Sequence, residues 1–211
     1  MNQILDQLFI RHGELSIIKL NIKEAAGIII NSYRNGGKLL ICGNGGSSSD
    51  SGHIAGELMK GFMKKRPLDK LLQNKIRSLS PEYGDMLTKN LQQGLPAISL
   101  SAHTDLLTAI INDINGDLVY AQQVTGYGKE GDVLLGLSSS GNSKDVLFAL
   151  TLARAMGLKT IAMTGATGGK MKGECDVLIN VPETATALVQ ELHLPVYHAI
   201  CQIVEEEFFS L

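Results

Sequence analysis

The sequence has no tryptophan, few aromatic residues, only three cysteines and little net charge. A net charge of −2 gives no basic surface of the kind that binds nucleic acid or anionic membranes. Cys42, Cys175 and Cys201 lie far apart without a CxxC pair, which argues against a disulfide framework or a thiolate zinc site. No apolar run is long enough for a membrane span, and charges interrupt the apolar N-terminus, so we expect a soluble, cytoplasmic protein.

The chain instead has 23 glycines distributed among apolar runs, and its 211 residues can bury one sizeable core. We therefore expect a single domain over residues 1–211. The one cluster of like charge, Lys64-Lys65-Arg66, is typical of a solvated helix end and predicts no function.

Five short apolar runs predict strands, and each ends in glycine, serine or a turn. They are KLLICGNGG from Lys38, LPAISLSA from Leu95, DVLLGLSSSG from Asp132, KTIAMTGATGG from Lys159 and DVLINVP from Asp176. Continuous rather than alternating apolar runs indicate strands covered on both faces, as in a parallel sheet. Helical patterns between the runs predict a doubly wound α/β domain, which binds ligands at the carboxyl ends of its strands.

Three segments carry clear helical patterns. Residues 4–34 predict one or two opening helices, residues 143–156 a helix that ends before Gly157, and residues 184–209 a closing helix that contains Pro195. The long connection 66–94 predicts two short helices, with Ser80 capping the second and Pro81 at its first position.

Two of the strand ends are rich in hydroxyl groups and glycine. Residues 137–146, LSSSGNSKDV, combine the N–H groups of a helix N-terminus with several serine hydroxyls, a set of donors that suits a phosphate; residues 42–49 form a second such turn. Serine and glycine are also ordinary loop and cap residues. Neither a P-loop nor a dinucleotide fingerprint is present, so a small phosphorylated, hydroxyl-rich ligand fits better than a nucleotide.

His53 and Glu57 are four residues apart on the helix predicted after the first loop, so they share a face. They could bind zinc, move protons, or form a plain surface hydrogen bond. Gln190 and His198 lie on the closing helix, eight residues or about 12 Å of rise apart. They could meet one metal through a bend at Pro195, or different subunits could supply them.

Taken together, these motifs resemble sugar isomerase (SIS) domains and, among these, phosphoheptose isomerases. CGNGGSSSDSGHIAGEL, IINDINGD, GDVLLGLSSSGNS, TGATGGKM and VQELHLPVYHAI occur in the family's order over nearly the whole chain, with residues 66–94 as the main exception. The resemblance implies a three-layer αβα sandwich with a five-stranded parallel sheet of the flavodoxin-like kind, preceded by N-terminal helices. Residues 66–94 then form a helical insertion in a single SIS domain.

The same resemblance implies the residues of the site. Glu57 and His198 would be the proton-transferring pair, as base and acid. Zinc would be bound by His53, Glu57, Gln190 and His198. The substrate would be bound by Asn44, Gly45, Gly46, Ser47, Glu57, Asn112, Asp113, Ser138, Ser139, Ser140, Ser143 and Gln190, with the last four serines on the phosphate. His193 falls on a family position without assigned chemistry.

The expected activity is therefore an aldose–ketose isomerase that converts sedoheptulose 7-phosphate to D-glycero-D-manno-heptose 7-phosphate through an enediolate, in a homotetramer. The chain departs from close relatives at Lys60-Gly61-Phe62, where they carry an arginine, and at Ala187, where they carry an aspartate. Both changes weaken the assignment of the substrate. Residues 66–94 could cover the site, pack at a subunit interface or alter which sugar fits, and we favour the interface.

Two other classes of function compete with the isomerase. A non-catalytic adaptor resembling the replication initiator-associating protein is similar around LTAIINDINGDLVYAQQV, but it lacks the glutamate and the second histidine that this chain has. A phosphosugar-sensing domain usually accompanies a second domain, for which 211 residues leave no room. An isomerase for another phosphosugar also fits the residues.

Overall fold

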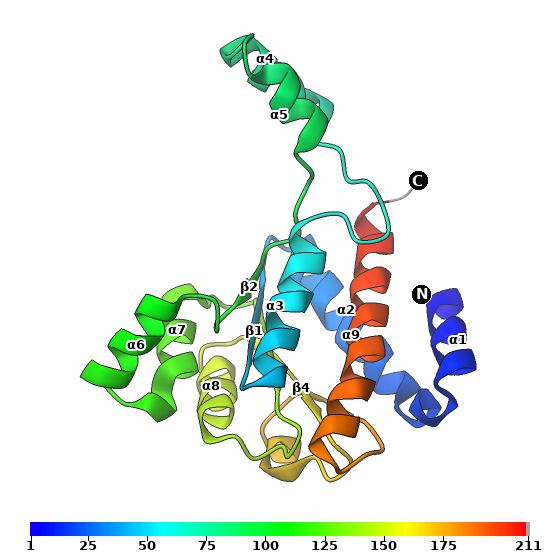
Figure 1. Ribbon diagram of the computed structural model, residues 1–211, viewed down its shortest axis with the longest axis vertical. Coiled ribbons are helices and arrows are strands. Elements are labelled where there is room, and N and C mark those ends of the chain that lie inside the picture. Colours follow the sequence, from blue (N-terminus) through cyan, green and yellow to red (C-terminus); the bar gives the residue numbers. More distant parts are fainter. Residues whose placement is uncertain (210–211) are drawn as a thin grey trace.

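The computed structural model describes residues 1–209, and its centre is a five-stranded parallel sheet (Figure 1). The strands follow the order β2-β1-β3-β4-β5, with Ile41 paired to Leu135 and Leu135 to Ile161 in the middle of the sheet. All five predicted strands are present: β1 (Leu39–Gly43), β2 (Ala97–Ser99), β3 (Val133–Leu137), β4 (Lys159–Thr164) and β5 (Val177–Asn180).

Both faces of the sheet are buried, which confirms the prediction from the continuous apolar runs. Successive side chains of a strand point to opposite faces. Leu39 and Ile41 therefore belong to one core, whereas Leu40 and Cys42 belong to the other. The result is a three-layer αβα sandwich.

One face of the sheet is covered by the N-terminal helices together with α3 and the long C-terminal helix α9 (Figure 1). The opening segment forms two helices joined by a 3₁₀ turn, and α9 continues through Pro195. The elements are α1 (Asn2–Arg11), η1 (Gly13–Ile18), α2 (Lys19–Arg34), α3 (Gly46–Met59) and α9 (Thr186–Phe208). Among residues 1–209, no helix combines the length and the apolarity that crossing a bilayer requires.

The other face is covered by α7 and α8, with α6 and a 3₁₀ turn beside them. The helix predicted at 143–156 is α8, and Gly157, with φ +79°, follows its end as expected for a helix C-terminus. The elements are α6 (Thr104–Asp113), η2 (Gly116–Leu118), α7 (Val119–Tyr127), α8 (Lys144–Ala155) and η3 (Gly169–Gly173).

The connection 66–94 forms a hairpin of two helices, α4 (Lys70–Leu79) and α5 (Gly84–Asn90), that projects from the body (Figure 1). The prediction that Ser80 caps the second helix and that Pro81 opens it was wrong. Ser80 ends α4, its hydroxyl accepts a bond from the Tyr83 N–H at 3.4 Å, and α5 starts only at Gly84. Pro81 lies in the turn instead, because its fixed φ suits a turn as well as a helix start.

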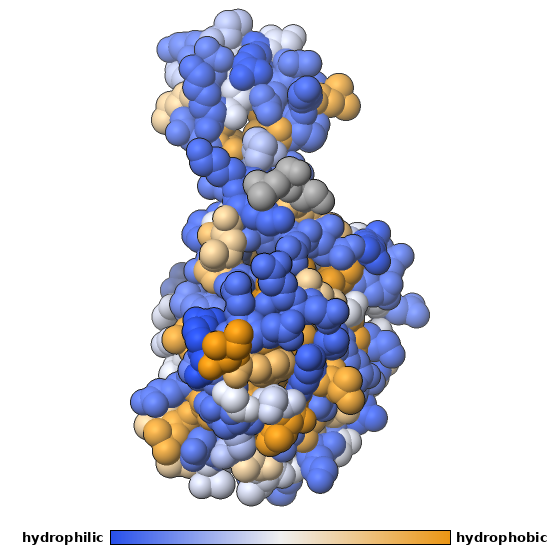
Figure 2. Space-filling model, turned by 90° about the vertical axis from the view of Figure 1, so that its right-hand side faces the viewer, coloured by the Kyte–Doolittle hydropathy of each residue, from blue (hydrophilic) through white to orange (hydrophobic). Residues whose placement is uncertain are grey.

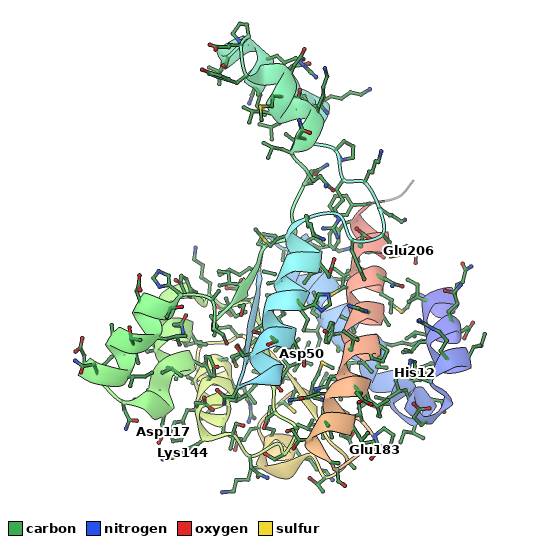
Figure 3. The ribbon with its side chains drawn as sticks, in the orientation of Figure 1. His12, Asp50, Asp117, Lys144, Glu183 and Glu206 are labelled. Atoms are coloured by element: carbon green, nitrogen blue, oxygen red, sulfur yellow. The ribbon has the colours of Figure 1, made fainter. Side chains whose placement is uncertain are left out.

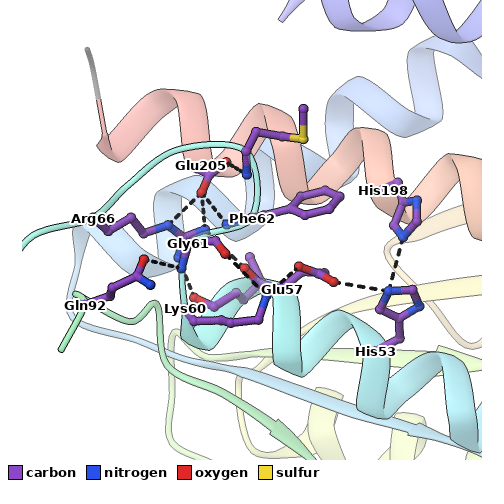
Figure 4. A network of polar contacts seen from close by, with 11 residues as sticks. His53, Glu57, Lys60, Gly61, Phe62, Arg66, Gln92, His198 and Glu205 are labelled. Carbon is purple, nitrogen blue, oxygen red and sulfur yellow. Dashed lines mark hydrogen bonds and ion pairs between the residues drawn. The ribbon is translucent and has the colours of Figure 1, made fainter. Parts of the chain in front are cut away.

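The basic run at the root of this hairpin also differs from the prediction. Arg66 is fully buried rather than solvated, and its Nε donates to Glu205 Oε1 at 2.8 Å (Figure 4). The N–H groups of Phe62 and Met63 donate to the same carboxylate at 2.9 and 2.8 Å. Burial alone would raise the pKa of Glu205, but these donors and the guanidinium outweigh it, so the pKa is lowered.

Candidate active site

A crevice opens at the carboxyl ends of β1 and β3, where the order of the strands reverses. Open α/β sheets bind ligands at this switch point because the two connections leave in opposite directions and the loops separate. The crevice has a volume of about 310 Å³. It is lined by Asn44, Gly45, Gly46, Ser47, Leu137, Ser138, Ser139, Ser143, Thr186 and Gln190. Nine of these ten residues can offer a side-chain or backbone polar group without a large apolar side chain.

The β1 side of the crevice is held by hydrogen bonds to residues of α7 and α8. Tyr120 Oη donates to the Gly43 carbonyl at 2.6 Å, and Asn44 Nδ2 reaches both carboxylate oxygens of Asp145 at 3.0 and 2.9 Å. Gly45 has φ +55°, which favours glycine. A Cβ on Gly46 would lie 2.5 Å from Gln190 Nε2, so glycine here lets the amide of Gln190 approach the start of α3.

The β3 side presents hydroxyl groups at the N-terminus of α8. Ser138 Oγ and Ser143 Oγ are 2.9 Å apart, and Ser143 precedes the first residue of the helix. Both the N-terminal N–H groups and the helix dipole favour an anion at this position. Ser140 is outside the lining, where its hydroxyl accepts a bond from the Asn142 N–H at 3.2 Å.

Asn112 and Asp113 are also outside the lining of this crevice. They end α6, both are exposed, and Asn112 Nδ2 donates to Asp113 Oδ1 at 2.8 Å. The structure therefore brings together eight of the twelve predicted substrate-binding residues, and it leaves this pair, Ser140 and Glu57 outside the lining.

A second cluster lies between α3 and α9, where two predicted residues of α3 meet a third from α9 (Figure 4). His53 Nε2 is 3.2 Å from Glu57 Oε1 and 3.4 Å from His198 Nε2. Glu57 Oε2 is 3.1 Å from Lys60 Nζ. The Glu57 side chain is 15% exposed and that of His53 42%, so the cluster is open on the side of His53.

The tautomer of His53 follows from the groups behind it. Tyr197 Oη lies 3.2 Å from Asp50 Oδ1 and 3.0 Å from His53 Nδ1. The hydroxyl has one proton, which it donates to the carboxylate, so it accepts from His53 Nδ1–H. Asp50 projects from α3 toward α9, which carries Tyr197 (Figure 3). In this tautomer a neutral His53 would present the lone pair of its Nε2 to Glu57 and His198.

This assignment leaves acceptor atoms facing each other at the centre of the cluster. The lone pair of His53 Nε2 faces a carboxylate oxygen at 3.2 Å, an arrangement that is favourable only with a proton or a cation between them. Zn²⁺ binds imidazole nitrogen and carboxylate oxygen at about 2.0–2.2 Å, so two of its tetrahedral ligands lie about 3.3–3.5 Å apart. The observed separations of 3.2 and 3.4 Å are close to this spacing. The donor types fit zinc chemically, although within residues 1–209 no group of three or more His, Cys, Asp or Glu is arranged to hold a metal ion.

Comparison with known proteins shows the family of the chain. The SIS domain family model matches residues 15–90 and 75–165. The phosphoheptose isomerase of Rhodospirillum rubrum is 40% identical over 202 residues, which cover 96% of this chain and 92% of that protein. The phosphoheptose isomerase structure from Neisseria gonorrhoeae superposes with a TM-score of 0.75 at 32% identity, covering 97% of this chain and 96% of the other. The chain belongs to the SIS-domain phosphoheptose isomerase family.

A phosphoheptose isomerase structure from Francisella tularensis has a TM-score of 0.76 at 27% identity and the same two coverages. The family resemblance inferred from the motifs, and the fold that it implied, are thus confirmed. The assignment of single residues to roles stays a prediction.

Gln190 is separated from the other predicted zinc ligands of this SIS domain. It lines the crevice, two helical turns before His198 on α9. No hydrogen bond within residues 1–209 joins it to His53, Glu57 or His198.

Sequence reasoning missed the residues that support the cluster. Asp50 and Tyr197 were not selected, although Asp50 is one turn before His53 and Tyr197 is next to His198. A polar residue one turn from a candidate ligand was an available signal for Asp50. No local signal pointed to Tyr197, because its contact with His53 spans 144 positions.

Proposed function

We propose that this chain is an aldose–ketose isomerase that converts sedoheptulose 7-phosphate to D-glycero-D-manno-heptose 7-phosphate. The observation that carries the proposal is the cluster in Figure 4, where a carboxylate and an imidazole from distant segments meet through His53. Its relatives named phosphoheptose isomerase, at 40% identity over most of the chain, support the substrate class.

The crevice at the switch point binds the phosphate end of the sugar. Ser138, Ser139 and Ser143 supply hydroxyl groups, and the free N–H groups at the start of α8 supply further donors. Asn44, Gln190 and the backbone at Gly45, Gly46 and Ser47 bind the hydroxyl groups of the sugar chain. We keep Ser140, Asn112 and Asp113 as secondary contacts from the rim.

Glu57 is the general base of the reaction. Isomerisation requires removal of a proton from the carbon beside the carbonyl and its return to the neighbouring carbon through an enediolate. Glu57 Oε1 lies 3.2 Å from His53 Nε2 and Oε2 lies 3.1 Å from Lys60 Nζ, and these two contacts keep the carboxylate oriented.

His198 serves the oxygen atoms of the substrate. Its pKa is lowered, first by burial and then by the neighbouring His53, with Glu57 acting in the opposite direction. The imidazole is therefore neutral near pH 7, and a neutral imidazole with one N–H stabilises an enediolate by donating a hydrogen bond and passing a proton between the two oxygens.

Zinc fits the chemistry of the cluster, and we propose His53, Glu57 and His198 as its ligands, with Gln190 of a second copy as the fourth. When bound, the metal would polarise the carbonyl of the substrate. A carboxylate bound to zinc is a weaker base than a free one. Glu57 must therefore be free of the metal when it removes the proton.

The distance between the two clusters supports an assembly of several copies. Eleven residues of α3 separate Gly46 from Glu57, a rise of about 16 Å. Seven covalent bonds of about 1.5 Å join C2 of the sugar to phosphorus, so the substrate spans at most about 10 Å. We infer that Glu57 acts on a sugar whose phosphate is bound by a second copy, within a homotetramer. Exposed apolar side chains at Ile10, Ile17 and Leu20 provide surface for such contacts.

The adaptor function is not favoured by the comparisons, since the relatives carry the name of the enzyme. We also propose a cytoplasmic location, because the three cysteines are free and two of them are buried, as in proteins from reducing compartments.

The test is direct assay of the purified protein with sedoheptulose 7-phosphate, with and without added zinc, following formation of the aldose. We expect turnover by the wild type and a loss of about 10²–10⁴-fold in kcat for Glu57→Gln, the usual contribution of a general base. Glu24→Gln, an exposed carboxylate on α2, is the matched control and should behave as wild type. A wild-type protein that is inert under both conditions would overturn the proposal.

A further inference from the structure

The hairpin α4–α5 is a part of the molecule that the proposed reaction does not use. It lies at the amino end of the sheet, because it follows the C-terminus of α3, whereas the crevice lies at the carboxyl end (Figure 1). In Figure 2 it forms a separate lobe above the body, with apolar side chains on its flanks. Its function therefore has to be sought in its own surface.

The two helices pack on each other, and within residues 1–209 neither packs extensively on any other helix or strand. Helices of ten and seven residues are too short to be stable alone in water. Most of the stability of a helix in a protein comes from burying an apolar face. The hairpin has such faces and leaves them exposed.

The exposed apolar side chains of the hairpin follow helical spacing. Leu72 and Leu79, with the half-buried Ile76 between them, form a stripe along α4, and Tyr83, Leu87 and Leu91 form a second stripe that runs into α5. Leu79 is 86% exposed and Leu71 66%. Met86 is 70% exposed. A monomer rarely leaves so many large apolar side chains in water, so this surface marks a contact.

The base of the hairpin is fixed to the body, although its two helices pack mainly on each other. The buried pair Arg66–Glu205 fixes the segment that leads into α4, and Arg66 Nη1 also donates to the Leu58 carbonyl at 2.6 Å. The returning strand is tied to it by the antiparallel bridge Pro67–Gln92 and by the bond from Gln93 N–H to the Arg66 carbonyl at 2.7 Å. The hairpin is therefore held out from the body in a set direction rather than left as a loose loop.

We propose that the α4–α5 hairpin is an arm that packs against a second copy of this chain. Seven large apolar side chains of the hairpin are exposed by more than a third, which at about 150–200 Å² for a whole side chain gives roughly 700 Å² of apolar surface. One side of a stable protein interface buries about 800 Å². The arm alone thus approaches the area that a dimer needs.

The charges on the arm are compatible with a partner of the same sequence. Lys70, Lys75, Arg77 and Lys89 are balanced in part by Asp69, Glu82 and Asp85, and Arg77 and Asp85 already pair at 3.1 Å. Strong charge of one sign would indicate an oppositely charged partner and would repel a second copy. The near balance removes that repulsion, and two-fold symmetry supplies an equal apolar surface on the other side. This inference holds whether or not the chain is an isomerase.

The experiment is the measurement of molar mass in solution by light scattering on a sizing column at tens of micromolar protein. The apolar variant carries Leu72→Ser, Leu79→Ser and Leu87→Ser. The matched control carries Asn74→Ser, Lys75→Ser and Lys89→Ser, three exposed polar positions on the same helices. We expect a wild-type mass of at least twice the 22.7 kDa of one chain, the same mass for the control, and at most half the wild-type mass for the apolar variant.

A second variant separates loss of the contact from unfolding of the arm. The bridge Pro67–Gln92 brings the two ends of the hairpin together, so residues 68–91 can be replaced by a short Gly-Ser linker without opening the body. We expect this variant to show the same fall in mass while its body still unfolds in a single cooperative transition. A wild type of 22.7 kDa, or shortened and apolar variants that keep the wild-type mass, would overturn the proposal.

Discussion

The crevice at the switch point and the cluster between α3 and α9 are built in different ways. The crevice is made by short stretches at the ends of two paired strands, and its polar groups already bond to one another, as Ser138 does to Ser143 and Asn44 to Asp145. The cluster joins α3 to α9 over 145 positions, and its atoms face one another as acceptors. A satisfied crevice is suited to bind a ligand, whereas unsatisfied acceptors are suited to hold a cation or to move a proton.

The largest effect is expected when two inactive variants, one altered in the cluster and one in the crevice, are mixed. If each reaction centre combines Glu57 of one copy with the crevice of another, chains carrying Glu57→Gln and chains carrying Ser143→Glu should restore activity when refolded together. Random pairing predicts recovery of about a quarter of the wild-type rate, because one site in four receives both intact parts. Mixtures that stay inactive while each variant still assembles would place both parts of the centre in one chain.

Tyr197→Phe tests whether the cluster depends on the groups behind it. Without the hydroxyl, His53 loses the partner of its Nδ1, and Oδ1 of the half-buried Asp50 loses a donor. Loss of such a supporting bond costs about 10–100-fold in metal affinity, which competition with a chelating dye measures without any turnover. Tyr127→Phe on α7 is the control and should leave zinc affinity unchanged. Equal affinities in both variants would show that Tyr197 does not orient His53.

Ser138→Ala tests the other side of the comparison. It removes one donor to the phosphate and the partner of Ser143, and a hydrogen bond to a charged group contributes about 1.5–3 kcal/mol. We expect KM to rise by about 10–100-fold with kcat nearly unchanged, because the bond is made in the ground state and the transition state alike. A fall in kcat at constant KM would instead give the serine a role in the chemistry.

The smallest effect on activity is expected at His193, which lies on α9 between the two regions. Its ring is fully buried, both nitrogens lack a hydrogen-bond partner within the described part of the chain, and burial lowers its pKa to about 4 despite an opposing effect of the Thr164 backbone. As the pH falls, His193 of the unfolded chain therefore binds a proton near pH 6.5, whereas in the folded chain it binds one only near pH 4. The free energy of unfolding should fall by up to about 3 kcal/mol as the pH decreases through this window.

Denaturant unfolding of wild type and His193→Gln at several pH values between 4 and 7 measures this loss. The variant should show a flatter dependence on pH, and the activity of both proteins at pH 7 should be similar. Parallel curves would mean that His193 does not account for the acid sensitivity.

The sequence predicted the fold and the crevice because both depend on local pattern. Continuous apolar runs such as that from Lys38 define buried parallel strands, and the serines after β3 are neighbours along the chain. Arg66 was misread because a charge run says nothing of Glu205, 139 positions away. The start of α5 was misplaced because Pro81 suits both a turn and a helix start. Tyr197 was missed because its role exists only through contacts with α3.

The measurement that tests the account most directly is calorimetric titration of the Glu57→Gln variant with sedoheptulose 7-phosphate, beside its turnover. If the crevice binds and the cluster reacts, the variant should bind the sugar phosphate with a Kd within about threefold of the wild-type value while turnover falls by at least about 100-fold. A variant that turns over at the wild-type rate, or one that is inactive because it no longer binds the sugar, would contradict the division between the two regions.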